Sequence, residues 1–158
     1  RLDKETYQRR EAFELRGQDQ EYIGELITRY ASDEWYLPLQ RFADSKDCSP
    51  SGILINEFVM NSIVREYGFS WRIVSPKAKD RRYERGVMVK DTMEITVYDQ
   101  LIAEVLSEAG IYSLTASQLL SFLQVHQLAF KTIPKELEAS DYFDVSDNQF
   151  YIIKKRDS

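Results

Sequence analysis

Hydrophobic side chains recur at helical spacing through the first half of the chain, with polar or glycine-containing breaks between the runs. This spacing predicts four helices, the first ending at Gly17 and the last at Gly68, with a polar loop over 44–52 before the last one. Apolar and polar residues then alternate in two short stretches, which predicts an antiparallel hairpin with a long connection. The predicted helices cover residues 3–17, 20–31, 38–45 and 53–67, and the predicted strands cover 69–74 and 85–90.

The second half repeats this plan. Residues 96–99 and 115–118 have the spacing of capping boxes, so a helix is expected to begin at each. A short extended link over 111–114 joins these helices, a third helix is expected over 132–140, and strands over 142–145 and 149–153 end the chain. We expect Phe150 or Ile152 to seal a core made of Ile102, Leu106, Leu119, Leu123 and Leu137.

These elements predict a mainly α protein with small antiparallel hairpins, of the α+β class. We expect an N-terminal helix over 1–19, a first unit over 20–92 and a second unit over 93–158. The order helix, short strand, helix, helix, hairpin in residues 96–154 resembles the winged-helix variant of the helix-turn-helix, and residues 20–90 have a similar order. The resemblance implies two winged-helix-like units in tandem.

A shorter resemblance covers about 30 residues of the first unit. Asn56-Glu57-Phe58, Tyr67-Gly68-Phe69 and Arg81-Arg82-Tyr83-Glu84-Arg85-Gly86-Val87 are similar to the last helix and wing of the C-terminal winged helix in phage and plasmid primase–helicase proteins. This resemblance implies a DNA-contacting appendage of a DNA replication protein.

Composition excludes several classes of protein. Of the 158 residues, 13% are aromatic, which is too rich for a disordered chain. Polar residues interrupt the longest apolar stretch, 53–63, so neither a membrane span nor a membrane partner is expected. The single cysteine, Cys48, suits a reducing compartment, and we expect a cytoplasmic location, or a nuclear one in a eukaryote. Because the sequence starts at Arg1 rather than Met, we expect it to be part of a larger chain.

Positive charge is concentrated in one place. Residues 72–90 carry a net charge of +5, whereas the whole chain carries −5. Side chains in the long connection of the first hairpin, here called the basic segment, can neutralise phosphates of a nucleic acid. The simpler interpretation is a solvated loop in which Asp80 and Glu84 are local partners. The basic segment consists of Lys77, Lys79, Arg81, Arg82 and Arg85.

The helix over 53–67 is the candidate recognition helix of the first unit. Glu57, Asn61 and Arg65 form a polar stripe at four-residue spacing. In the major groove, asparagine can pair with adenine and arginine with guanine. However, Met60 and Val64 lie on a third side, and a helix that is apolar on two sides is more often buried in a core. A surface for a protein partner is the third interpretation.

The second unit is less suited to DNA. The charges near its expected recognition helix are balanced, and its hairpin carries Asp141, Asp144 and Asp147, which repel phosphates. This unit is better suited to packing or to a protein partner. The basic tail 154–156 is interpreted as a frayed, solvated end.

Catalytic signals are scarce. His126 is the only histidine and reads as structural, while Cys48 has no neighbouring base. One histidine and one cysteine cannot make a zinc site, and no glycine-rich phosphate loop is present, so no enzyme activity, metal or cofactor is expected. The first hypothesis is a non-enzymatic DNA-binding module of a replication or regulatory protein. The alternative is a winged-helix adaptor between proteins.

Overall fold

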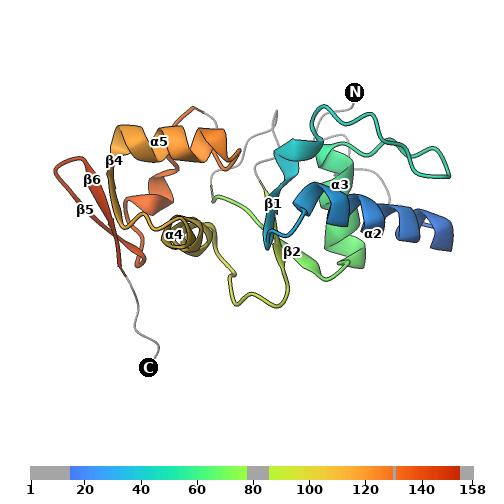
Figure 1. The fold of residues 1–158 in the computed structure, drawn as a ribbon, viewed down its shortest axis with the longest axis horizontal. Helices are drawn as coiled ribbons and strands as arrows, with labels where there is room; N and C mark the ends of the chain where they lie inside the picture. Colours follow the sequence, from blue (N-terminus) through green and yellow to red (C-terminus); the bar gives the residue numbers. More distant parts are fainter. Residues whose placement is uncertain (1–14, 78–85, 130, 154–158) are drawn as a thin grey trace. The chain divides into compact units, whose positions relative to one another are not determined.

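The computed structural model describes residues 15–77, 86–129 and 131–153 (Figure 1). Within these ranges the chain forms four α-helices and two antiparallel three-stranded sheets, which confirms the α+β class. Contacts divide the chain into two units. The first contains residues 1–73 and 80–94, and the second contains Val74–Lys79 and residues 95–158.

The first unit contains two α-helices, a 3₁₀ turn and a sheet. The strand order in the sheet is β1-β3-β2, with Leu37 of β1 opposite Met88 of β3. In chain order the elements are α2 (Gly17–Ala31), β1 (Tyr36–Pro38), η1 (Leu39–Phe42), α3 (Glu57–Tyr67), β2 (Trp71–Val74) and β3 (Val87–Lys90).

One apolar cluster holds these elements together. Ile23 and Ile27 of α2 pack with Val59 and Ile63 of α3, and Met88 brings β3 into the same cluster. All five side chains are buried, and full burial of an aliphatic side chain contributes about 1.5–3 kcal/mol. The stripe of apolar residues that predicted the helix over 20–31 is therefore the stripe that faces the core.

The second unit has α4 and α5 beside a sheet whose strand order is β4-β6-β5. Asp147 and Asn148 have left-handed φ angles of 48° and 64°, as a tight two-residue hairpin turn requires. The elements are α4 (Tyr98–Glu108), β4 (Ser113–Thr115), α5 (Ala116–Val125), the 3₁₀ turn η2 (Lys135–Leu137), β5 (Phe143–Ser146) and β6 (Gln149–Ile152).

The predicted core of the second unit is confirmed. Phe150 packs edge-to-face on Phe143 with ring centroids 6.2 Å apart, and it seals the core from the hairpin, whereas Ile152 is half-buried. The predicted core residues are all fully buried: Ile102, Leu106, Leu119, Leu123 and Leu137. The capping box at the start of α5 is also confirmed, since Thr115 and Gln118 each accept the other's backbone N–H.

Three boundaries in the first unit were predicted wrongly. Gly17 begins α2, so it does not end a helix there, and residues 1–14 lie outside the described residues. The predicted helix over 38–45 is strand β1 followed by η1, because the buried segment Tyr36–Pro38 pairs with β3. The helix predicted over 53–67 begins only at Glu57, where the side chain of Asn56 accepts the backbone N–H of Val59.

Two helix signals in the second unit were misleading. The capping box predicted at 96–99 does not form: the N-cap of α4 is Val97, which makes no side-chain cap bond, and Asp99 accepts a hydrogen bond from the hydroxyl of Ser140. The helix predicted over 132–140 is only η2, preceded by Pro134 in an extended conformation. The sequence spacing there was helical, but the segment is too short to gain the cooperative stability of a helix.

The two units share one order of elements. Each has a helix, a strand, a second helical element, a third helical element and a terminal hairpin. In each, the first strand pairs with the last one, so β1-β3-β2 corresponds to β4-β6-β5. The lengths differ: the third helical element is the 11-residue α3 in the first unit and the three-residue η2 in the second.

Candidate nucleic-acid interface

Most of α3 is buried, which confirms the core interpretation of this helix. Its first five residues, from Glu57 to Asn61, are all buried, and so are Ile63 and Val64. Of its charged side chains, only Arg65 and Glu66 are exposed. A helix that reads bases needs exposed side chains over its first turns, and α3 has none there.

The structure brings Asn61 and Arg65 together, but as partners of each other. The Nε–H of Arg65 donates to Oδ1 of Asn61 at 2.8 Å, and Asn61 is only 6% exposed. An amide that accepts this bond inside the protein cannot also present both of its polar atoms to an adenine edge. Within the predicted polar stripe, Asn61 and Arg65 therefore contact each other along α3, and the contact joins a buried side chain to an exposed one.

Replacing Asn61 with alanine is expected to cost about 1–2 kcal/mol of unfolding free energy, because the bond from Arg65 and the packing of a buried amide are lost. Urea unfolding measures this cost, and Glu66→Ala, at an exposed site one residue beyond Arg65, is the matched control with a change under about 0.5 kcal/mol. If Asn61→Ala left stability unchanged but altered the preference among DNA sequences, this buried role would be wrong.

Two cations, Arg72 and Lys90, lie at the base of the first hairpin. Both belong to the basic region 72–90, but neither was among the predicted site residues. Arg72 of β2 donates from Nη2 to the backbone oxygen of Asp91 at 3.0 Å. Lys90 of β3 places Nζ 5.8 Å from the ring centroid of Trp71, within range of a cation–π contact. Both cations are held by neighbouring residues on the strands that lead into and out of the basic segment.

The basic segment itself is described only at its beginning. Lys77 is exposed, and its backbone N–H donates to Oε1 of Glu136 at 2.7 Å. Both residues belong to the second unit. The other members of the segment, Lys79, Arg81, Arg82 and Arg85, lie outside the described residues, as does the basic tail over 154–156.

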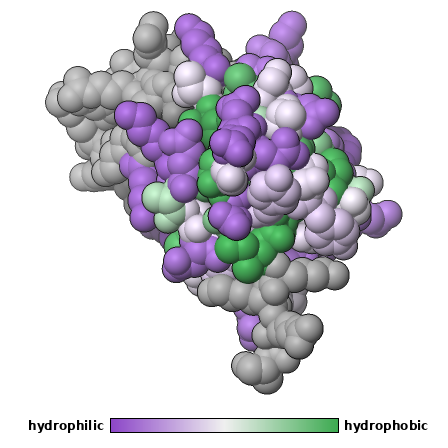
Figure 2. All heavy atoms as spheres, turned by 90° about the vertical axis from the view of Figure 1, so that its left-hand side faces the viewer, coloured by the Kyte–Doolittle hydropathy of each residue, from purple (hydrophilic) through white to green (hydrophobic). Residues whose placement is uncertain are grey.

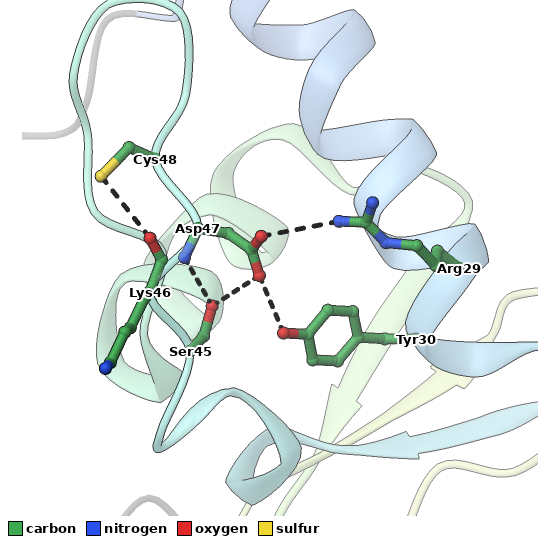
Figure 3. A network of polar contacts seen from close by, with 6 residues as sticks. All are labelled: Arg29, Tyr30, Ser45, Lys46, Asp47 and Cys48. Carbon is green, nitrogen blue, oxygen red and sulfur yellow. Dashed lines mark hydrogen bonds and ion pairs between the residues drawn. The ribbon is translucent and has the colours of Figure 1, made fainter.

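A long loop separates η1 from α3, where a compact helix-turn-helix has a turn of three or four residues. Asp47 fixes one side of this loop to α2 (Figure 3): it accepts hydrogen bonds from the hydroxyls of Tyr30 and Ser45, both at 2.8 Å, and lies 3.6 Å from Arg29. The Ser45 and Tyr30 bonds, and to a lesser extent the charge of Arg29, lower the pKa of Asp47. Ser45 and Asp47 of the predicted loop are therefore structural anchors.

A second carboxylate anchors the tip of the same loop. Asp19 is buried at the start of α2 and accepts the Ser51 hydroxyl at 2.7 Å, the Ser51 backbone N–H at 3.0 Å and the Arg16 backbone N–H at 3.2 Å. The Ser51 hydroxyl is the largest cause of the lowered pKa of this carboxyl, although desolvation opposes it. Asp19 thus caps α2 and holds the loop at once.

These anchors give the stability of the first unit a defined pH dependence. A carboxyl whose pKa is lower in the folded state than its ordinary 3.8 stabilises the fold above that value, and this stability is lost as the pH falls through the folded-state pKa. We expect Asp19→Asn to be less stable than the parent at neutral pH and to lose less stability below about pH 4.

Urea titrations at several pH values measure this difference. The exposed Asp44 in the same loop provides a matched control, since Asp44→Asn makes the same change of charge without removing an anchor. Equal acid sensitivity of the parent chain and Asp19→Asn would contradict the anchoring role.

Other candidate chemistry finds little support. In the described ranges no group of three or more His, Cys, Asp or Glu side chains could hold a metal ion. His126 packs on Phe122 with ring centroids 4.3 Å apart, and Cys48 is exposed on the anchored loop. No helix among the described residues is long and apolar enough to cross a membrane.

Comparison with known proteins gave no matching family model, no similar curated protein and no similar solved structure. A functional assignment therefore depends on the residues and the geometry alone.

Proposed function

We propose that this protein is a non-enzymatic nucleic-acid-binding module made of two winged-helix-like units, and that it contacts DNA phosphates through the basic segment. The topology carries the proposal. In both units a helix, a strand, two helical elements and a hairpin follow one another, and the first strand pairs with the last. In a winged helix this order makes the connection between the last two strands the wing.

The connection between β2 and β3, which is the proposed wing, contains the densest positive charge in the sequence. Residues 72–90 carry a net charge of +5, while the remainder carries −10. Arg72 and Lys90, two of the cations in this count, lie on the strands at its base. Lysines and arginines grouped in this way bind the phosphate backbone and release its counterions.

The proposed contact with DNA is general rather than sequence-specific. Phosphate contacts position a protein on the duplex but carry no sequence information. Because the first turns of α3 are buried and Asn61 is bonded to Arg65, this helix contributes little base recognition. We therefore propose that specificity comes from the larger replication or regulatory protein to which the module belongs. The single exposed thiol, Cys48, favours an intracellular, reducing setting for it.

A specific observation favours the adaptor function as a second candidate. In the second unit, the three-residue η2 takes the place of a recognition helix, and Asp144 and Asp147 are exposed on the hairpin where a DNA-binding wing needs cations. This unit does not suit a phosphate backbone. An adaptor would use both units for proteins and would bind no nucleic acid.

Fluorescence anisotropy with labelled duplexes of unrelated sequence tests the choice between these functions. At about 50 mM salt we expect binding that varies less than about threefold among the sequences. The absence of binding at this salt concentration would favour the adaptor. A preference above about 100-fold for one duplex would show base recognition and contradict the phosphate mode.

A further inference from the structure

Among the described residues, side chains on the outer face of the second unit's sheet are exposed. Tyr151 on the central strand β6 is 45% exposed, and the strand register places Ser113 of β4 and Asp144 of β5 on either side of it. Ile153, two residues along on the same side, is 43% exposed. Figure 2, which looks at the side where β5 and β6 lie in Figure 1, shows green hydrophobic atoms next to pale and strongly hydrophilic ones.

Within the described part of the chain, β5 is an edge strand of the same sheet. Two hydrogen-bonded pairs fix the pattern of the ladder: Ser146 with Gln149 closes the two-residue turn, and Ile153 donates its N–H to Tyr142. In an antiparallel ladder, alternate residues then point their backbone groups away from the partner strand. On β5 these residues are Phe143 and Val145, whose N–H and C=O groups bond to no other part of the described chain.

The charge of this edge indicates what can pair with it. Asp141, Asp144 and Asp147 are exposed, and the hairpin over 141–153 contains no lysine or arginine. Pairing of β5 with the β5 of a second copy would bring these carboxylates together, and like charges opposite each other destabilise a sheet. Negative charge on an edge strand prevents self-association in this way. A strand that carries positive charge meets no such repulsion.

We propose that β5 binds a basic extended segment of a partner protein, which adds to the sheet as a fourth strand. Phe143 and Val145 would exchange backbone hydrogen bonds with the added strand, which gives affinity without sequence preference. Alternate side chains of the added strand project to the outer face, where its cations meet Asp144. The site belongs to the second unit and is independent of DNA binding by the wing of the first.

Short capped peptides provide the test with the full chain. One peptide alternates arginine with valine, one alternates glutamate with valine, and one is the arginine peptide with N-methyl groups on alternate amides. We expect the arginine peptide to bind at least about tenfold more tightly than the other two at low salt. We also expect it to slow hydrogen exchange at the amides of Phe143 and Val145.

Two variants locate the binding site. Val145→Pro removes an outward N–H and is expected to abolish the protection at Phe143. Asp144→Asn with Asp147→Asn keeps the backbone and is expected to weaken the arginine peptide roughly fivefold. Glu104→Gln with Glu108→Gln makes the same change of charge at exposed positions of α4 and is expected to have little effect.

Three results would overturn the proposal: no peptide binding at low salt, equal binding of the glutamate peptide, or protection of amides outside β5. Adding duplex DNA distinguishes peptide binding at β5 from DNA binding by the wing. DNA is not expected to change the hydrogen-exchange protection at Phe143 and Val145. Displacement of the peptide by DNA would show instead that the peptide occupies the surface that binds DNA phosphates.

Discussion

Replacing Arg81, Arg82 and Arg85 together with glutamine is expected to weaken duplex binding by roughly two to three orders of magnitude at about 0.1 M salt. The reason is counterion release. Each phosphate contact contributes about 0.9 to the slope of log affinity against log salt, so three lost contacts lower the slope by about 2.7. The loss should be the same for every duplex sequence, because phosphates are alike in all of them.

A matched control distinguishes the effect of the wing from the effect of net charge. This second triple variant replaces Lys154, Lys155 and Arg156 with glutamine, so it also loses three positive charges, but from the C-terminal tail. Circular dichroism shows whether both triple variants retain the fold, which we expect because each variant replaces only charged side chains with polar ones. If the tail variant lost as much affinity and slope as the wing variant, net charge rather than the wing would account for binding.

Truncating Leu106 to alanine is expected to cost about 2–5 kcal/mol of unfolding free energy. Leu106 is fully buried in α4, among the residues that form the core of the second unit. The variant loses the favourable free energy of transferring the removed methyl groups from water to the core. The remaining cavity adds a further cost, because the close-packed surroundings relax only in part. Chemical denaturation followed by circular dichroism measures the loss.

Val125 serves as the control for this change. It lies at the end of α5 and is 78% exposed, so Val125→Ala is expected to cost less than about 0.5 kcal/mol. Both tryptophans, Trp35 and Trp71, belong to the first unit, so their fluorescence reports whether the loss spreads beyond the second. A cost under about 0.5 kcal/mol for Leu106→Ala would contradict the core described for the second unit.

Periodicity predicted the long helices because burial and spacing agree in them. α2, α4 and α5 have apolar stripes that are buried at the expected positions. It failed where a short segment takes its structure from a distant partner. Tyr36–Pro38 is a strand only because β3 lies beside it, and no local pattern contains that information. The start of α3 was available from the sequence, since Asn56 is a preferred N-cap residue.

The candidate site shows the same limit. The spacing of Asn61 and Arg65 correctly placed them on one side of a helix, but spacing does not show whether that side is exposed. The anchors of the long loop were also hidden, because Asp19 and Ser51 are 32 residues apart in the sequence. Charge density, in contrast, depends on sequence alone, so the basic segment could be nominated as a candidate site without the structure.

The slope of log affinity against log salt for the intact chain and duplex DNA tests the phosphate-binding wing most directly. With four or five cations of the basic segment on phosphates, we expect a slope near −4, from about 0.9 for each contact. Binding that persists with a slope between about 0 and −1, or no binding even at about 20 mM salt, would contradict the proposal that this wing binds DNA.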